Sequence, residues 1–250
     1  MKNITVIKFG GSLTKNTEAQ RNFIQELAQI SQKQKIVLVH GGGPEINNLL
    51  NRLNIESKFV NGLRYTDEQT LEVVEMVLSG KVNKMLTAEL IACGIKAVGI
   101  SAKDGSIAVC DVKKELGFVG EPTKINISLI ENLINGGFFP VISSVGIDKT
   151  AHALNINADT LATNIAIEFK ADKLIFLTDV AGVLDKNKNT IKEIKITEVD
   201  NLIKSEIITG GMIPKINSCK QAVLKGVKEV YIIDGVSGIK QFNGTVIKKQ

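Results

Sequence analysis

The chain lacks the long apolar stretches and the N-terminal signal that would direct it to a membrane or a secretory pathway. No apolar stretch approaches the roughly 18 uninterrupted residues of a transmembrane helix. The N-terminal run MKNITVIKFGGS is short and contains Lys8, so it does not have the form of a secretory signal. We therefore expect a soluble, intracellular protein that makes no contact with a membrane.

Cysteine is also scarce. Cys93, Cys110 and Cys219 are odd in number, far apart and outside any CxxC spacing. This pattern indicates neither a disulfide framework nor a zinc site. A reducing cytoplasm is the compartment that fits best.

The chain has no low-complexity tract and only 4 prolines, whereas 44% of its residues are apolar and 22 are glycine. This is the composition of an ordinary globular protein. The net charge of +5 is spread over pairs such as Lys113-Lys114 and Lys248-Lys249, and no basic block is interleaved with aromatic residues. We therefore expect no nucleic-acid partner, although a modest positive field suits small anionic substrates.

Short β-branched runs alternate with longer segments of helical period. We expect strands over 4–9, 35–39, 97–100, 139–143, 173–177, 229–233 and 245–247, and helices near 17–32, 44–53, 68–92, 126–135, 158–169 and 212–225. Strands that are apolar on both faces and separated by helices specify a mainly parallel sheet. The predicted fold is a three-layer α/β/α sandwich, with small hairpins at its rim over 103–124 and 183–197. Since no stretch resembles a linker, residues 1–250 are expected to be one domain.

Glycine follows several of the predicted strands. Ligands of open parallel sheets bind beyond the carboxyl ends of the strands, where these glycines lie. They are Gly10-Gly11, Gly41-Gly42-Gly43 and Gly182, and a further pair, Gly210-Gly211, precedes the last predicted helix. Bare backbone N–H groups with a helix N-terminus behind them form an anion cradle. A tight turn is the alternative for any single pair, and the spacings match neither a Walker loop nor a dinucleotide fingerprint.

A series of motifs resembles the amino acid kinase family, and within it the members that phosphorylate N-acetyl-L-glutamate. In chain order they are VIKFGGS, VHGGGPEIN, FVNGLRYTDEQTLEVVEMVLSGKVNK, GFVGEPTKIN, VISSVGID, LNINADTLAT, FLTDVAGVL and ITGGMIPKI, over about residues 4 to 233. The resemblance implies transfer of phosphate from ATP to the γ-carboxylate, giving N-acetylglutamyl 5-phosphate in arginine biosynthesis. It also implies an N-terminal lobe, about 1–155, that binds the acylated amino acid, and a C-terminal lobe, about 156–250, that binds ATP.

The resemblance also implies roles for individual positions. The catalytic group is Lys8, Lys215 and Asp159, and the substrate-binding group is Gly42, Gly43, Arg64 and Asn155. The nucleotide-binding group is Gly10, Gly11, Thr178, Asp179, Gly182 and Met212. Mg²⁺ is expected to arrive with ATP as part of the co-substrate, with no dedicated protein metal site and no tightly bound cofactor.

These residue types suit the chemistry. Phosphoryl transfer to a carboxylate brings two anions together, so the two lysines would neutralise the transferring group. Asp159 would hold both lysines by ion pairing and need not act as a base, because the attacking carboxylate is already ionised at neutral pH. Arg64 offers a planar fork for the α-carboxylate, with Asn155 assisting.

Each of these residues also has a plainer interpretation. A strand-end lysine such as Lys8 can be a surface residue, and Asp159 can simply serve a helix dipole. Arg64 can form an interhelical salt bridge. His40 is expected to make structural hydrogen bonds, and His152 has no motif support.

Related kinases are the nearest alternatives. An aminoadipate kinase would have an altered glycine loop and an insertion before the arginine, whereas HGGGPEIN and NGLRYTD are intact here. An aspartokinase would carry an appended regulatory domain, which we do not expect here, and carbamate and uridylate kinases lack the NGLR match. A catalytically inactive nucleotide or arginine sensor is disfavoured by the presence of Lys8, Asp159 and Lys215.

Two features depart from the family pattern. The chain starts at its first strand, without the extra helix that links dimers into hexamers in arginine-inhibited relatives, so we expect an arginine-insensitive homodimer. The helix near 68–92 has Val73, Val74, Val77 and Leu78 on one face, which is a candidate for the dimer contact, with core burial as the favoured alternative. The C-terminal run IIDGVSGIKQFNGTVI is short and lacks the usual helix before the last strand.

Overall fold

The computed structural model describes residues 3–10, 17–178, 180–236, 238–239 and 243–249. The chain forms two compact units: unit 1 comprises Met1–Ile36 and Ala162–Gln250, and unit 2 comprises Val37–Leu161. The N-terminal segment therefore groups with the C-terminal part of the chain, whereas the lobe predicted over about 1–155 included it. The physical reason is that the first strand pairs in parallel with a strand of the C-terminal part.

Unit 1 is built on a mainly parallel sheet. Its strands are ordered β12 (Glu193–Lys195), β14 (Gly244–Lys248), β13 (Glu229–Asp234), β11 (Lys173–Thr178) and β1 (Ile4–Phe9). Among the described strands of this unit, only β14 runs antiparallel to its neighbour β13. The connection from Asp234 to Gly244 is shorter than the dozen or so residues that a parallel crossover needs. The core of the unit lies on both faces of these strands, which are buried at successive positions.

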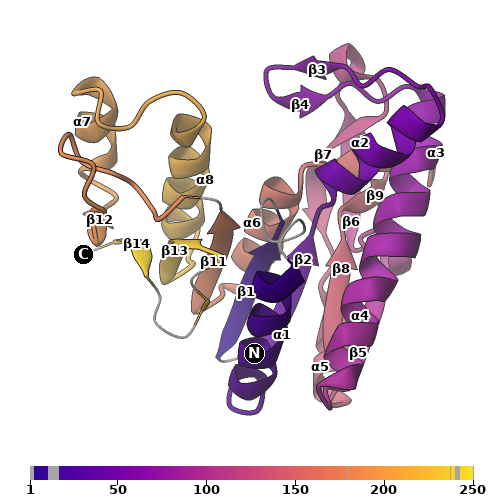
Figure 1. Ribbon diagram of the computed structural model, residues 1–250, viewed down its shortest axis with the longest axis horizontal. Helices are drawn as coiled ribbons and strands as arrows, with labels where there is room; N and C mark the ends of the chain where they lie inside the picture. The colour runs from indigo at the N-terminus through magenta and orange to yellow at the C-terminus, as the bar shows by residue number, and fades with distance from the viewer. Residues whose placement is uncertain (1–2, 11–16, 179, 237, 240–242, 250) are drawn as a thin grey trace. The chain divides into compact units, whose positions relative to one another are not determined.

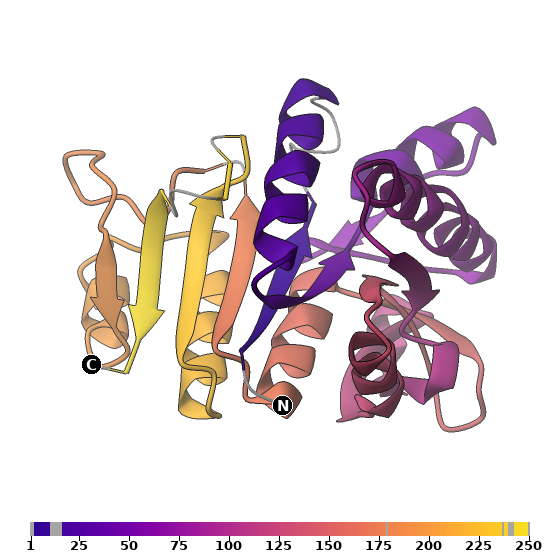
Figure 2. The same cartoon turned by 90° about the horizontal axis from the view of Figure 1, so that it is seen from below.

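Helices cover both faces of this sheet. Figure 2 shows α1 (Thr17–Ser31) in front of the strands and α8 (Met212–Leu224) behind them. On the α1 side, the rings of Phe9 and Phe23 lie 5.2 Å apart. The short helix α7 (Val199–Lys204) packs on α8, while α6 (Ala158–Phe169) starts in unit 2 and enters unit 1 at Ala162.

Unit 2 contains three parallel strands in the order β2 (Lys35–His40), β8 (Phe139–Ser143) and β5 (Ala97–Ser101). The helices α2 (Gly43–Arg52) and α5 (Ser128–Asn135) belong to this unit. Beside the strands lies a small closed barrel of β6 (Ala108–Val112), β7 (Val119–Ile125), β9 (Val145–Ile147) and β10 (Ala153–Ile156). A two-stranded hairpin, β3 (Phe59–Val60) and β4 (Leu63–Arg64), completes the unit (Figure 1).

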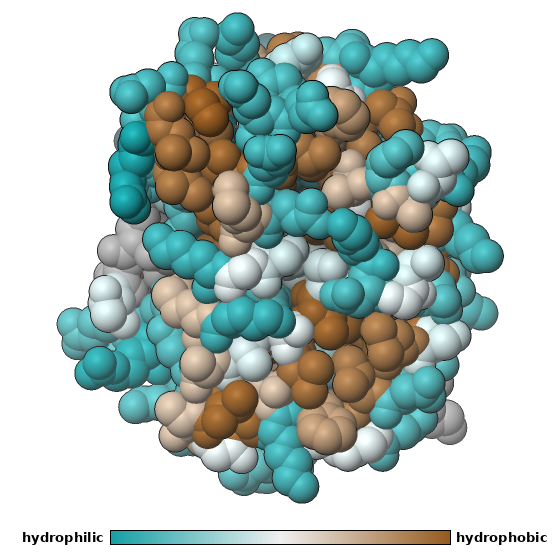
Figure 3. Space-filling model, turned by 90° about the vertical axis from the view of Figure 1, so that its right-hand side faces the viewer, coloured by the Kyte–Doolittle hydropathy of each residue, from teal (hydrophilic) through white to brown (hydrophobic). Residues whose placement is uncertain are grey.

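The longest helix of unit 2 has a π-helical turn in its middle. It runs from α3 (Glu68–Glu75) through η2 (Met76–Val82) into α4 (Asn83–Ala92), which Figure 1 shows as one continuous rod. Such π-turns are uncommon and frequently lie at functional sites. Figure 3, which views the side that carries this helix, shows apolar patches separated by polar ones. Met76, Met85 and Ile91 are exposed apolar residues of the helix.

The predicted α/β class is confirmed, as are the principal helices and strands. The antiparallel pairing of β6 with β7 confirms a hairpin within 103–124. The hairpin predicted over 183–197 is wrong in its second half: Leu184 and Thr190 form an isolated antiparallel bridge, but β12 pairs in parallel with β14. The outer edge of β14 has backbone N–H and C=O groups that need hydrogen-bond partners, and β12 provides them.

Candidate active site

The glycine loop of unit 2 links the end of β2 to the start of α2. Helix α2 begins at Gly43 with Gly42 as its N-cap, and no side chain caps it. Pro44 lies in its first turn, where a missing N–H costs nothing. The first N–H groups of this helix are therefore available to an anion.

Glycine occupies positions 42 and 43 of this loop for different structural reasons. A Cβ on Gly42 would lie 2.8 Å from Cδ2 of Leu78 and 3.2 Å from Cγ2 of Val82, so packing against the π-helical turn favours glycine there. A Cβ on Gly43 would meet nothing within 4 Å. Packing does not require glycine at position 43, which leaves close approach of a ligand as a reason for it.

Arg64, on β4, reaches the same loop. Its Nη2 donates to Oδ1 of Asn47 at 2.6 Å and, at the longer distance of 3.4 Å, to the carbonyl oxygen of Gly43. Nη1 donates to Oγ of Ser57 at 3.1 Å, and the guanidinium lies 4.7 Å from the centre of the Phe59 ring. These contacts hold the planar fork of Arg64 beside the first turn of α2.

The charge of Arg64 has no acidic partner in the part of the chain that the structure describes. The residue is only 8% exposed, and the hydrogen bonds above all go to neutral groups. Burial lowers the pKa of its guanidinium. The alternative of an interhelical salt bridge is therefore wrong within the described residues. A buried cation with neutral partners favours an anionic ligand.

Asn155, on β10, is connected to Arg64 through one hydroxyl. Its Nδ2 donates to Oγ1 of Thr66 at 3.1 Å, and that hydroxyl donates to the carbonyl oxygen of Arg64 at 3.1 Å. The structure thus brings Gly42, Gly43, Arg64 and Asn155 into one region of unit 2. Sequence reasoning missed Asn47 and Ser57, which hold the arginine. Asn47 lies within the HGGGPEIN motif, but nothing in the sequence marks Ser57.

His40 ends β2 and is fully buried. Its Nδ1 lies 2.9 Å from the carbonyl oxygen of Gly41, and its Nε2 lies 3.0 Å from Nδ2 of Asn83. Burial lowers the pKa of the imidazole to about 4, so the ring is neutral at physiological pH. The structural hydrogen bonds expected of His40 are confirmed.

Two lysines of unit 1 lie on the same side of its sheet. Phe9 faces α1, so Lys8, the residue before it, faces the opposite side. Lys8 is the register partner of Phe176 on β11, and Nζ of Lys215, in the first turns of α8, lies 5.5 Å from the centre of the Phe176 ring. The structure therefore brings Lys8 and Lys215 to one region. The ammonium group of Lys8 lies against Gly10, where an added Cβ would be 3.0 Å from Nζ.

The other described residues predicted to bind the nucleotide lie at the end of β11, in the loop that follows it, and at the start of α8. Thr178 is buried and donates to the carbonyl oxygen of Val180 at 2.8 Å. Gly182 has a φ of +126° and lies so close to Thr245 that a Cβ would be 2.6 Å from its Oγ1. Met212 opens α8, which no side chain caps. Gly11 and Asp179 lie outside the described residues.

Asp159 occupies the first turn of α6. The preceding Asn157 caps this helix, its Oδ1 accepting from the N–H groups of Asp159 and Thr160 at 2.9 and 3.0 Å. An acid at this position interacts favourably with the helix dipole. This geometry agrees with the plainer interpretation of Asp159 and leaves a catalytic role as a prediction.

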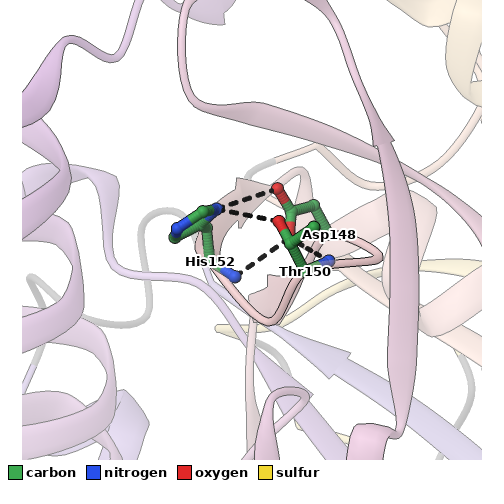
Figure 4. A network of polar contacts seen from close by, with 3 residues as sticks. All are labelled: Asp148, Thr150 and His152. Carbon is green, nitrogen blue, oxygen red and sulfur yellow. Dashed lines mark hydrogen bonds and ion pairs between the residues drawn. The ribbon is translucent and has the colours of Figure 1, made fainter.

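His152 lies in the turn between β9 and β10. Figure 4 shows it with Thr150 and Asp148, whose Oδ1 accepts from the Thr150 hydroxyl at 2.8 Å. The hydrogen bond from Thr150 lowers the pKa of Asp148 to about 2. Among the described residues no group of three or more His, Cys, Asp or Glu side chains could hold a metal ion, and no helix could span a bilayer.

Lys8 near the end of β1, Lys215 in the first turns of α8 and glycine loops after parallel strands are features that suit an enzyme acting on small anions. The chain is a member of the amino acid kinase family, whose sequence model matches residues 3–234. It is 60% identical over 249 residues to an acetylglutamate kinase of Endomicrobium trichonymphae, with both chains covered in full. It is 49% identical to an acetylglutamate kinase of Clostridioides difficile, covering 92% of this chain and 82% of that one.

Solved structures agree on the fold. A crystal structure from Streptococcus mutans UA159 matches with a TM-score of 0.86 and 34% identity, covering both chains in full. The carbamate kinase of Giardia matches with a TM-score of 0.76 at 19% identity, covering 100% of this chain and 99% of that chain. At that identity the likeness shows the fold alone.

Proposed function

We propose that this chain uses ATP to phosphorylate the γ-carboxylate of N-acetyl-L-glutamate, producing N-acetylglutamyl 5-phosphate in arginine biosynthesis. The observation that carries the proposal is the full-length similarity to curated acetylglutamate kinases. The geometry of unit 2 supports it independently, because Arg64 is a buried cation beside the uncapped N-terminus of α2. Such a pair of groups suits a small dicarboxylate.

In this proposal Arg64 grips the α-carboxylate with Asn155 nearby, and the N–H groups of Gly42 and Gly43 hold the other end of the substrate. The guanidinium forms three hydrogen bonds to neutral groups, which orient its fork before the substrate arrives. A preoriented bidentate donor selects a planar carboxylate over other anions.

Lys8 and Lys215 are proposed to neutralise charge on the transferring phosphoryl group. Both lie on the α8 side of the unit 1 sheet, next to Phe176. In phosphoryl transfer the protein contributes mainly positioning and cationic stabilisation, which two preplaced ammonium groups supply. Asp159 keeps the role that the family resemblance implies, orienting these lysines.

ATP is the proposed phosphoryl donor, with Mg²⁺ bound to its phosphates. The uncapped start of α8 at Met212 and the loop after β11, with Thr178 and Gly182, are the proposed nucleotide contacts. Gly10, Gly11 and Asp179 complete the proposed set. A helix N-terminus preceded by glycines suits phosphate groups.

The test is ATP-dependent acyl phosphate formation, trapped with hydroxylamine. N-acetyl-L-glutamate would be compared with free glutamate, aspartate and N-acetyl-aminoadipate. A strong preference for N-acetyl-L-glutamate is expected. Activity only with another acid would contradict the substrate, and no activity with any of them would contradict the kinase assignment.

We further propose a cytoplasmic homodimer that arginine does not inhibit. The free cysteines Cys93, Cys110 and Cys219 fit a reducing compartment. Val73, Val74, Val77 and Leu78 of the long helix are buried in the core, which is the alternative to a dimer contact, whereas Met76, Met85 and Ile91 are exposed to a second copy. Sedimentation with and without arginine tests the dimer, and the acyl phosphate assay with and without arginine tests the absence of inhibition. A monomer, a change of assembly or a loss of activity with arginine would contradict the proposal.

A further inference from the structure

A buried pair of side chains, His40 and Asn83, lies next to the glycine loop of unit 2. Both residues are fully buried, and neither has been assigned a part in the reaction above. Asn83 is the first residue of α4, directly after the π-helical turn. A buried polar side chain lowers stability unless it is hydrogen-bonded, so the hydrogen-bond partners of this pair indicate its role.

The orientation of the Asn83 amide is determined by its neighbours. Its Nδ2 lies 3.1 Å from the carbonyl oxygen of Ile100 and 3.0 Å from that of Val141. Backbone carbonyls only accept hydrogen bonds, so the amide nitrogen must face them. Oδ1 accepts from Nζ of Lys84 at 3.1 Å, which agrees with this orientation.

The orientation of Asn83 in turn determines the tautomer of His40. An amide nitrogen cannot accept a hydrogen bond, so Nε2 of His40, 3.0 Å from Nδ2 of Asn83, is the acceptor and shares the two amide hydrogens with the carbonyl oxygens of Ile100 and Val141. The ring proton then resides on Nδ1. From there it is donated to the carbonyl oxygen of Gly41 at 2.9 Å.

A donor at the Gly41 carbonyl fixes the direction of the next N–H group. In a planar trans peptide the C=O and the following N–H point in opposite directions. The carbonyl of Gly41 is turned toward the imidazole, so the N–H of Gly42 points away from it. We infer that His40 and Asn83 are positioning residues that aim the Gly42 N–H at the substrate, an inference that rests on the proposed function.

Two further features make room for the Asn83 side chain. A Cβ on Gly99 would overlap Oδ1 of Asn83 and Oγ1 of Thr87, so glycine is required there for the amide to lie against β5. The π-helical turn, Met76–Val82, immediately precedes Asn83. A wider turn changes the direction in which later side chains leave the helix, so replacing it by an α-helical turn would point Asn83 elsewhere.

Two substitutions of His40 separate positioning from packing. In His40→Asn the side-chain amide can replace Nδ1 as the donor to Gly41, whereas in His40→Gln it reaches the position of Nε2 and leaves the Gly41 carbonyl without its donor. We expect His40→Gln to lower kcat for N-acetyl-L-glutamate about tenfold to a hundredfold relative to His40→Asn, because a misplaced group loses transition-state stabilisation. Urea unfolding of both variants controls for stability. Equal kcat values at equal stability would overturn the inference.

A measurement on the wild type does not depend on activity. The chain has 2 histidines, so the side-chain ¹⁵N resonances of His40 can be assigned against the exposed His152. We expect a protonated Nδ1 and an unprotonated Nε2 in His40. A proton on Nε2 in the wild type would overturn the inference. If this tautomer is found but the wild type forms no acyl phosphate, the proposed function fails while the arrangement of the pair stands.

Discussion

Nη2 of Arg64 donates to Oδ1 of Asn47 at 2.6 Å, which ties the β3–β4 hairpin to the second turn of α2. This contact places a guanidinium beside the glycine loop although Arg64 and Gly43 are 21 positions apart in the sequence. The bond goes to a neutral amide, so the positive charge is oriented without being neutralised.

Arg64→Lys should weaken substrate binding while leaving the fold intact. Lysine keeps the charge but loses the planar fork that reaches Asn47 and a carboxylate together. We expect the KM for N-acetyl-L-glutamate to rise about tenfold or more, with little change in the KM for ATP. The matched control is Arg52→Lys, at an exposed position in the last turn of α2, the helix that carries Asn47. Equal KM values for the two variants would contradict the proposed role.

Gly43→Ala should affect binding without lowering stability. A Cβ at position 43 meets nothing within 4 Å, and alanine favours a helix by up to about 1 kcal/mol over glycine. We expect an unchanged or raised urea midpoint and a raised KM for N-acetyl-L-glutamate. Gly42→Ala makes the comparison, since its Cβ would crowd Leu78 and should lower the midpoint. Full activity in Gly43→Ala would argue against close approach of the substrate.

Lys215→Ala should lower kcat on the order of a hundredfold, by analogy with removal of one preorganised group that stabilises transition-state charge. Lys220→Ala, on the same helix, removes a lysine that pairs with Asp200 at 2.7 Å and should leave kcat near the wild-type value. Steady-state kinetics of the acyl phosphate assay compares the two. Unchanged turnover in Lys215→Ala would remove this lysine from the proposed mechanism.

His40 should make stability depend on pH between about 6.5 and 4. The pKa of its imidazole is about 4 in the folded chain against an ordinary 6.5, so in this window the unfolded state binds more protons. The contribution, about 3 kcal/mol, is fully present above pH 6.5 and is lost as the pH falls toward 4.

Urea unfolding of the wild type and of His40→Asn across this range measures the effect. Asp148, whose pKa is lowered to about 2, loses its stabilising contribution only at still lower pH, so it does not overlap this window. The variant should show a flatter pH profile. Parallel profiles would show that His40 is not the group responsible.

Gly182→Ala should destabilise unit 1 whatever its role in nucleotide binding. The backbone φ of +126° is unfavourable for alanine, and a Cβ would lie 3.0 Å from the backbone nitrogen of Thr245. We expect a loss of about 1–3 kcal/mol in the free energy of unfolding. Thermal unfolding with and without ATP distinguishes this packing role from a contact with the nucleotide. An unchanged melting temperature without ATP would contradict the packing role.

The sequence predicted the principal elements well because their signals are local. Helix 68–92 and the parallel strands follow from apolar periodicity, which each segment carries by itself. Short elements were missed: β3 and β4 have two residues each, and β9 and β10 form an antiparallel pair inside the barrel. Strands this short have too few residues for an alternating pattern to stand out.

In the candidate site, too, some residues could be predicted from the sequence and others could not. Gly42, Gly43 and Arg64 were predicted from motifs, but the partners of Arg64 were not, because Asn47 and Ser57 meet it only after the hairpin folds onto α2. Likewise, His40 was expected to make hydrogen bonds, but its partner Asn83 was not predicted. The direction of the Asn83 side chain depends on the π-helical turn that precedes it.

By itself, the sequence determined that this chain is an α/β protein of the amino acid kinase family, since composition, periodicity and motifs are properties of the linear chain. Only the tertiary structure decided that the first strand joins the C-terminal strands, that Arg64 is buried without an acidic partner among the described residues, and that Asn83 orients His40. These depend on contacts between distant segments, whose geometry is set by packing rather than by local preference.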